Sequence, residues 1–342
     1  MKAAFFEGPG KVVIREIPTP ECPPGGLLTR VRVSAICGSD RRTFEYGSKD
    51  PSIVHGHECV MGVIETDDGT GRFTVGDRIL VAPVGCGQCY YCRRGLEHLC
   101  SRKEEVRTVK QGGFAEFRPV GREAIEGGYV MKVPDEITDA EATLVEPLAC
   151  VLNGNEKLAI YPGDSFVALG AGPVGNLHVQ MARLRGASTI VVVDVKDSRL
   201  ELNKPFGAAH LVNSSRVDPI AEVMKVTGDE GADRVVVACV SARAEAQAVA
   251  MARKQGEVLL FSALPDTAPE AVLNTNLIHI KELYVMGARS ATRRHFALAL
   301  QLLRTGRIDA RRLVTHTLPL DQIALGFEII KEGRGLKVVL EP

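Results

Sequence analysis

Short apolar runs, separated by polar residues and by clusters of Pro and Gly, occupy the first 150 residues of the chain. Apolar runs this short, bounded by turn residues, predict β-strands. The N-terminal part is therefore expected to be an all-β, barrel-like region. The predicted strands span residues 11–17, 28–35, 60–65 and 78–82.

From residue 164 onward, strand-like apolar runs alternate with longer segments that have helical periodicity. This alternation predicts a parallel sheet with helical crossovers. A glycine at 186, 207, 228 or 256 follows the helical segments and is expected to cap their C-termini, and Pro205 is expected to shorten the second helix. The predicted strands are 165–169, 189–193, 210–212, 234–239, 257–261 and 283–286, and the predicted helices are 173–185, 198–204, 218–227 and 242–253.

The segment after residue 287 returns to helical periodicity at 291–305 and 321–331 and ends in a strand-like run at 336–340. The chain contains no internal repeat. A length of 342 residues fits two domains, each with a sizeable core. The expected fold class is therefore a two-domain α/β protein with one β-barrel domain and one doubly wound parallel sheet.

The overall composition excludes several classes of function. Lys plus Arg and Asp plus Glu both number 42, so the chain lacks the basic surplus that nucleic-acid binders use to neutralise phosphates. No apolar stretch approaches the roughly 18 residues of a membrane span, and the N-terminus meets charge and glycine too early for a signal peptide. We expect a cytoplasmic protein with no nucleic-acid or membrane partner.

Nine cysteines, an odd number in a chain without a secretory signal, favour metal ligation over disulfides. Four of them, Cys86, Cys89, Cys92 and Cys100, lie within fifteen residues. Four thiolates close a tetrahedron around zinc and leave no open position, so this loop is expected to hold a structural zinc. Buried or redox-active cysteines are the alternative, whereas a nucleic-acid-binding zinc finger would need a recognition helix that does not follow.

A second set of candidate ligands has a different composition. Cys37, in the run Cys-Gly-Ser-Asp40, follows a predicted strand, and His57 and Glu58 come about twenty residues later. A thiolate, an imidazole and one or two carboxylates suit a zinc ion that keeps a position open for water or substrate. Glu146 adds a carboxylate just before the predicted parallel sheet, where two domains would meet around a cleft, although it could equally be a charge at a helix N-terminus.

The first strand of the predicted sheet runs into a glycine-rich turn that opens a helix. In the run Gly170-Ala-Gly172-Pro173-Val174-Gly175, the first glycine would make the tight turn and the second would let the backbone approach a pyrophosphate. The third would let the helix pack closely on the strand. The context of strand, turn and helix predicts a dinucleotide site.

Asp194 ends the next predicted strand, nineteen residues after Gly175. A carboxylate there can bind the hydroxyl groups of the adenosine ribose and would repel a 2′-phosphate, which favours NAD over NADP. Lys196 and Arg199 are nearby cations that could weaken this preference. A solvated strand end is the alternative interpretation of Asp194.

Taken together, these motifs resemble the zinc-dependent medium-chain alcohol dehydrogenases, particularly the sorbitol (polyol) dehydrogenase branch, over essentially the whole chain. The resemblance implies a GroES-like catalytic domain, residues 1–150 completed by 290–342, around a Rossmann NAD-binding domain, residues 151–289. It also implies two zinc ions per chain, one catalytic and one structural, and a homodimer or homotetramer.

The resemblance also implies roles for single residues. Cys37 and His57 correspond to catalytic-zinc ligands, and Glu58 and Glu146 fill or flank the remaining positions. In the sorbitol branch the carboxylate matching Glu58 ligates directly and the one matching Glu146 acts through zinc-bound water; which arrangement this chain uses stays open. Ser39 corresponds to the hydroxyl that takes the substrate proton, and Arg199 corresponds to a cation beside the adenosine ribose.

One position departs from the family pattern. Many relatives carry a proton-relaying histidine two residues after the Asp of the Cys-Gly-Ser-Asp run, where this chain has Arg42, preceded by Arg41. An arginine stays protonated and cannot be a neutral base, so the relay must end differently. The two arginines are either exposed charges or a site for an anionic substrate such as a sugar phosphate.

The expected function is therefore a zinc-dependent oxidoreductase that transfers a hydride between a secondary alcohol or polyol and NAD. A dehydrogenase of a phosphorylated polyol or of an amino alcohol such as threonine is the alternative within enzymes. A non-catalytic scaffold that binds zinc and a nucleotide is the alternative from another class.

Overall fold

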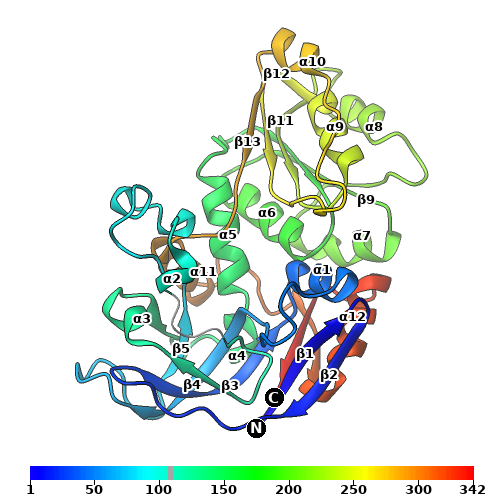
Figure 1. Ribbon diagram of the computed structural model, residues 1–342. Helices are drawn as coiled ribbons and strands as arrows, with labels where there is room; N and C mark the ends of the chain where they lie inside the picture. The colour runs from blue at the N-terminus through cyan, green and yellow to red at the C-terminus, as the bar shows by residue number, and fades with distance from the viewer. Residues whose placement is uncertain (107–110) are drawn as a thin grey trace.

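Two large sheets and the helices packed on them make up the molecule (Figure 1). The computed structural model describes residues 1–106 and 111–342. A seven-stranded, mostly antiparallel sheet combines strands from the N-terminal part of the chain with its last two strands, and a six-stranded parallel sheet lies beyond helix α5 (Val145–Asn155). This arrangement confirms the predicted two-domain α/β fold class.

The seven-stranded sheet has the order β14-β15-β3-β4-β5-β7, with β6 beside β3. Strand β3 is central and apolar, and seven of its nine residues are buried. A separate antiparallel ribbon is formed by β1 (Lys2–Gly8) and β2 (Lys11–Glu16). The strands of the seven-stranded sheet are β3 (Leu27–Ala35), β4 (Glu58–Thr66), β5 (Arg78–Val81), β6 (Phe117–Val120), β7 (Val130–Lys132), β14 (Val314–Pro319) and β15 (Lys337–Glu341).

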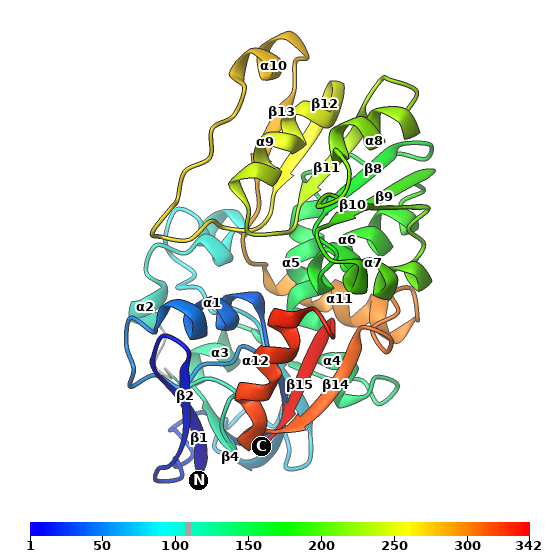
Figure 2. The same cartoon turned by 90° about the vertical axis from the view of Figure 1, so that its right-hand side faces the viewer.

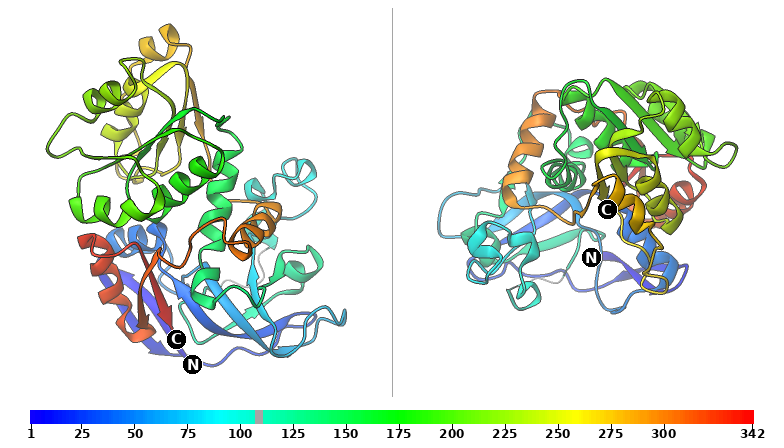
Figure 3. Two further views of the ribbon diagram at one scale, coloured as in Figure 1. Left: turned by 180° about the vertical axis from the view of Figure 1, so that it is seen from behind. Right: turned by 90° about the horizontal axis from the view of Figure 1, so that it is seen from above.

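The C-terminal segment of the chain returns to this first sheet. Strand β15 pairs antiparallel with β3, with Val339 opposite Ala35, and the two termini lie near each other in the views of Figures 1 and 3. The domain boundaries at residues 150 and 290 stay a prediction, and helix α5 runs through the first of these positions.

The parallel sheet has the order β10-β9-β8-β11-β12-β13, the strand order of a doubly wound dinucleotide-binding fold. Its order reverses between β8 and β11, and ligands of such sheets bind outside the carboxyl ends of the strands at that point. All six predicted strands are present. They are β8 (Ser165–Leu169), β9 (Thr189–Asp194), β10 (His210–Asn213), β11 (Ala232–Val237), β12 (Ala252–Leu260) and β13 (Tyr284–Gly287).

Successive side chains of the parallel strands enter two different cores. Val167 and Leu169 belong to one hydrophobic cluster, whereas Phe166 and Ala168 belong to another on the opposite face. This is the two-residue period of a strand buried on both faces, and it explains why these strands read as continuous apolar runs.

Helices cover both faces of the parallel sheet and connect it to the first sheet (Figure 2). Helix α7 ends before Pro205, as expected, but the predicted cap at Gly256 is wrong: α9 ends at Met251, Ala252 turns directly into an extended conformation, and Gly256 lies inside β12. The helices are α1 (Gly38–Tyr46), α2 (Lys103–Val106), α3 (Arg122–Glu126), α4 (Asp139–Ala142), α5 (Val145–Asn155), α6 (Pro173–Leu184), α7 (Asp197–Asn203), α8 (Pro219–Val226), α9 (Ala242–Met251), α10 (Thr275–Ile280), α11 (Arg293–Arg304) and α12 (Ile323–Glu332).

Within residues 1–106 and 111–342, none of the helices combines the length and the apolar character needed to cross a bilayer.

Candidate metal and cofactor sites

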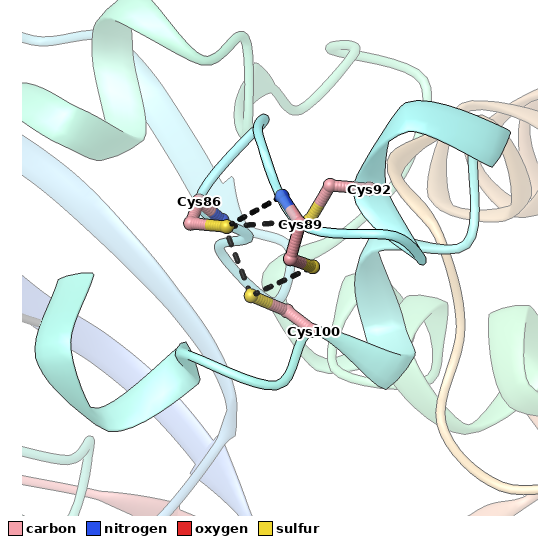
Figure 4. Close-up of side chains that lie close together, drawn as sticks. All are labelled: Cys86, Cys89, Cys92 and Cys100. Atoms are coloured by element: carbon pink, nitrogen blue, oxygen red, sulfur yellow. Dashed lines mark hydrogen bonds between the residues drawn. The ribbon is translucent and has the colours of Figure 1, made fainter.

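The side chains of Cys86, Cys89, Cys92 and Cys100 converge on one point (Figure 4). Their sulfur atoms all lie within 4.8 Å of one another. Cys86 Sγ lies 4.0 Å from Cys92 Sγ, and Cys89 Sγ lies 3.9 Å from Cys100 Sγ. Four thiolates bound tetrahedrally to zinc at about 2.3 Å stand about 3.8 Å apart. The loop therefore has the spacing of a four-thiolate zinc site.

Backbone N–H groups stabilise two of these thiols in the charged form. The N–H groups of Gln88 and Cys89 lower the pKa of Cys86, and those of Cys92 and Ser101 lower the pKa of Cys89 to about 5. Burial and the neighbouring thiols raise the pKa of Cys92 to about 12. Repulsion between neighbouring thiolates thus opposes the ionisation of all four thiols at once, and a bound cation would offset that repulsion. The donor set fits a metal.

The second candidate site forms where β3 and β4 pair. Cys37 follows β3 and is the N-cap residue of α1, and Glu58, the first residue of β4, stands opposite Ala35 in the ladder. This pairing brings Cys37 Sγ, one ring nitrogen of His57 and one carboxylate oxygen of Glu58 within 4.8 Å of one another. The three predicted ligands therefore lie together.

Asp40 supports this cluster from the first turn of α1. Its buried carboxylate accepts a hydrogen bond from the backbone N–H of Cys37 (2.9 Å), and its Oδ1 lies 3.7 Å from His57 Nδ1. Burial opposes protonation of His57, but the charges of Asp40 and Cys37 outweigh it and raise the pKa of His57 well above its ordinary value. The imidazole is thus held in a strongly negative environment that suits a cation.

Glu58 forms a buried ion pair with a residue from the other end of the chain. Lys337 Nζ, on β15, lies 2.5 Å from Glu58 Oε2, and the two residues are 2% and 1% exposed. Although burial lowers the pKa of Lys337, Glu58 raises it above its ordinary value. The other carboxylate oxygen, Oε1, is buried and has no hydrogen-bond partner within residues 1–106 and 111–342. An orphaned carboxylate oxygen beside a thiol and an imidazole fits a metal ligand.

Glu146 projects from α5 into the cavity that His57 and Glu58 also line. Cys150, one turn further along α5, donates a hydrogen bond to Glu146 Oε1 (3.4 Å). Burial raises the pKa of Glu146, opposed by His57 and reinforced by the charge of Glu58. Among the described residues, Glu146 stands outside the compact set formed by Cys37, His57 and Glu58.

The remaining predicted residues of this region lie on α1. Ser39 is exposed in the first turn of the helix. Arg41 Nε lies 3.6 Å from Glu45 Oε1, one turn along the same helix. Arg42 is half-buried and faces the loop after β12, where Lys49 and, more weakly, Arg42 lower the pKa of Asp266.

The glycine-rich turn between β8 and α6 has the geometry that a pyrophosphate needs. Gly170 adopts φ +115°, and a Cβ at Gly175 would lie 1.8 Å from the Gly170 carbonyl oxygen, so no other residue fits there. A Cβ at Gly172, by contrast, would meet open space. Gly172 caps α6 without a side-chain hydrogen bond, with Pro173 and Val174 opening the helix, so the N-terminal backbone N–H groups are available for an anion.

Asp194 ends β9 beside this turn and is 8% exposed. Its Oδ2 accepts a hydrogen bond from the backbone N–H of Ala171 (2.9 Å), and its Oδ1 accepts one from the backbone N–H of Lys196 (3.0 Å). The carboxylate is therefore fixed next to the phosphate turn. Arg199, which is expected beside the adenosine ribose, donates from Nη2 to the carbonyl oxygen of Ile330 (2.9 Å) at the end of α12.

Two supporting residues escaped the sequence analysis. Asp40 belongs to the Cys-Gly-Ser-Asp run, but no role was predicted for it. It stands three residues after the N-cap residue Cys37, where a carboxylate turns back toward the N-cap, and this spacing indicates a positioning role. Lys337 is a lone charge in the apolar run at residues 336–340, and a charge in a buried strand needs a partner.

Two family models match the chain. A model of the alcohol dehydrogenase GroES-like domain matches residues 23–135, and a model of zinc-binding dehydrogenases matches residues 173–305. The first match contains Cys37, His57 and Glu58, and the second contains Asp194.

Individual proteins match over nearly the whole length. The chain is 30% identical over 340 residues to a sorbitol dehydrogenase of Halalkalibacterium halodurans, covering 98% of this chain and 97% of the relative. It is 29% identical over 349 residues to a D-arabitol-phosphate dehydrogenase of Enterococcus avium, covering 100% and 97%. A solved structure of a zinc-binding dehydrogenase from Sinorhizobium meliloti 1021 bound to NADP superposes with a TM-score of 0.87 at 28% identity, covering 100% of this chain and 99% of that one.

Proposed function

We propose a specific arrangement of metal, cofactor and substrate from the premise that the chain belongs to the zinc-dependent medium-chain alcohol dehydrogenase family, in its sorbitol dehydrogenase-like branch. The chain is a zinc-dependent oxidoreductase of alcohols or polyols that uses a nicotinamide cofactor. To this we add that NAD is the preferred cofactor and that each chain holds a catalytic and a structural zinc.

The observation that carries the catalytic site is the unpaired Oε1 of Glu58. It is buried, and the Glu58 carboxylate lies in one cluster with Cys37 and His57. We propose that Cys37, His57 and Glu58 ligate the catalytic zinc directly, with Glu146 acting from the cavity wall through water. Three protein ligands leave a fourth position for the substrate oxygen. The four-cysteine loop would hold the second, structural zinc.

When bound, zinc supplies a Lewis acid for the alcohol oxygen, and the nicotinamide accepts the hydride. The residues of the chain position the ligands and move the proton. Asp40 faces His57 Nδ1, which leaves Nε2 for the metal. The exposed hydroxyl of Ser39 accepts the substrate proton and passes its own to water, because Arg42 stays protonated and cannot relay it.

The preference for NAD rests on Asp194. Its carboxylate is fixed beside the phosphate turn by two backbone N–H groups, in the position to bind the ribose hydroxyls. A 2′-phosphate would meet this negative charge. The turn at Gly170, Gly172 and Gly175 and the N-terminus of α6 would hold the pyrophosphate.

A phosphorylated polyol is the second candidate substrate. One relative is a D-arabitol-phosphate dehydrogenase, and Arg41 and Arg42 place two cations on α1, the helix that follows Cys37. The pairing of Arg41 with Glu45 weakens this candidate, because it offsets one of the two charges. An amino alcohol such as threonine is the third candidate. A non-catalytic scaffold needs no open metal site, so the three-residue cluster of Cys37, His57 and Glu58 argues against it.

Zinc content and a substrate panel test the proposal together. We expect about two zinc ions per chain in the purified protein and about one in Cys37→Ala, which should lose turnover while still binding NAD. Cys22→Ala is the matched control and should keep both ions, because Cys22 belongs to neither cluster and its thiol donates to backbone carbonyl oxygens. The panel of polyols, secondary alcohols, polyol phosphates and threonine is followed by NADH absorbance, with NADP for comparison. One zinc per chain in the wild type, or turnover in Cys37→Ala, would contradict the proposal.

We further propose a homodimer or homotetramer, testable by light scattering, and a cytoplasmic location. None of the nine cysteines, all of which lie among the described residues, forms a disulfide, and this supports the proposal of a reducing compartment.

A further inference from the structure

Three side chains at the start of α7 bind the C-terminal end of α12, the helix that precedes the last strand. Lys196 Nζ donates to the carbonyl oxygen of Lys331 (2.6 Å), and Ser198 Oγ donates to that of Gly333 (3.1 Å). The guanidinium of Arg199 donates to the carbonyl oxygen of Ile330. Figures 1 and 3 show α7, from the parallel-sheet side of the molecule, lying over the end of α12 from the other side.

Elementary helix chemistry explains this contact. The last carbonyl groups of a helix lack intrahelical partners and carry the negative end of the helix dipole, so they attract cations. Gly333 ends α12 at φ +75°, and a Cβ there would lie 2.9 Å from Lys196 Cδ and 3.3 Å from Arg199 Nε. The glycine therefore leaves the space through which both cations reach the carbonyls.

Lys196 also follows closely on the carboxylate that would recognise the ribose. Asp194 is two residues before Lys196 and accepts its backbone N–H. A site that takes a 2′-phosphate needs a nearby cation to pair with it. In this structure the ammonium of Lys196 is engaged by α12, whereas Arg199 gives α12 only its Nη2, and its buried Nε has no hydrogen-bond partner among the described residues.

We infer that the C-terminal turn of α12 is a cofactor-selectivity element, which holds the ammonium of Lys196 away from a 2′-phosphate and so reinforces the choice of NAD made by Asp194. This inference rests on the proposed NAD site. It makes selectivity for NAD over NADP depend on two features, the charge of Asp194 and the engagement of Lys196 by α12, so loss of Asp194 alone should not create an NADP site.

Binding measurements without substrate separate the two features. We expect Asp194→Ala to weaken NAD binding and to leave NADP binding weak, as measured by titration calorimetry. Adding Gly333→Ala places a Cβ 2.9 Å from Lys196 Cδ and pushes Lys196 away from the Lys331 carbonyl. It should tighten NADP binding by about tenfold over Asp194→Ala, the equivalent of one charged hydrogen bond. Adding Lys196→Met as a third change should remove that gain.

Gly306→Ala is the matched control. Gly306 also follows a helix, at φ +64°, but a Cβ there would meet nothing within 4 Å. It reproduces the backbone strain of Gly333→Ala without moving the cations, so it should not change NADP binding in the Asp194→Ala background. Equal NADP affinities in the two glycine variants would overturn the inference.

A comparison that avoids Gly333 guards against a variant that fails to fold. If α12 holds Lys196, Lys196→Met in the Asp194→Ala background should leave NADP affinity unchanged. A severalfold loss would show that Lys196 already reaches the phosphate and would overturn the inference. Failure of the wild type to bind NAD would instead contradict the proposed function itself.

Discussion

Lys337→Met should destabilise the metal-free protein strongly. The substitution removes the ammonium that lies 2.5 Å from Glu58 Oε2 and leaves a carboxylate that is 1% exposed without its counter-charge. Removing one partner of a buried ion pair costs about 3–5 kcal/mol. This is a large part of the roughly 5–15 kcal/mol by which native proteins are stable.

Zinc should reduce that loss, because a cation on Glu58 replaces part of the missing positive charge. The assay is urea unfolding followed by circular dichroism, since the chain has no tryptophan, in chelator and in excess zinc. We expect the difference in free energy of unfolding between wild type and Lys337→Met to be smaller in zinc than in chelator. Lys337→Met combined with Glu58→Gln should recover most of the stability in chelator, because the uncompensated charge is then gone.

Lys281→Met is the matched control. Lys281 Nζ is half-buried and donates to the carbonyl oxygens of Ala250 and Ala252, so its loss leaves no carboxylate unpaired. If Lys337→Met cost no more stability than Lys281→Met, or if zinc left the difference unchanged, the assignment of Lys337 as the residue that positions Glu58 would be refuted.

Three further predictions concern the two metal clusters and a buried histidine. Cys89→Ser should release one zinc and expose the loop at 86–100 to proteolysis while the catalytic zinc stays bound, which metal analysis checks. Asp40→Asn keeps an acceptor for the Cys37 N–H but loses its charge, so competition with a chelator should show roughly 10- to 100-fold weaker binding of the catalytic zinc, and unchanged binding would argue against a positioning role. Burial lowers the pKa of His178 from its ordinary value of 6.5 to about 3. At a pH between these two values, the imidazole is protonated in the unfolded chain but neutral in the folded chain. Stability should therefore fall as pH falls through this window, and His178→Gln should flatten the decline in urea unfolding from about pH 6.5 to about pH 4.

Local periodicity predicted the parallel sheet because its central strands are buried on both faces. Residues 166–169 and 190–193 are entirely buried, so they read as unbroken apolar runs. The same rule missed β14, which lies at the edge of the other sheet, is only partly buried and alternates Thr and His in its middle. It also missed α1, whose nine residues are mostly polar and contain a single buried side chain, Asp40.

Local spacing also predicted which metal ligands come together, but it could not predict the distant residues that pair with the site residues. Cys37, His57 and Glu58 sit at the ends of two adjacent strands, so short-range pairing is enough to cluster them. Lys337 reaches Glu58 across 279 residues of sequence, and Arg199 reaches Ile330 across 131. Such contacts depend on how the C-terminal segment packs, and no local pattern carries that information.

That C-terminal segment links the two candidate sites. The end of α12 binds Lys196 and Arg199 through the carbonyl oxygens of Lys331 and Ile330, and Ser198 through that of Gly333. Four residues later, Lys337 enters β15 and holds Glu58. Because β15 is locked in register against β3, a shift of the end of α12 must be absorbed within the short connection between them. One short stretch of backbone, from Ile330 to Lys337, therefore fixes both the contact of α7 with α12 and the position of the Glu58 carboxylate at the metal cluster.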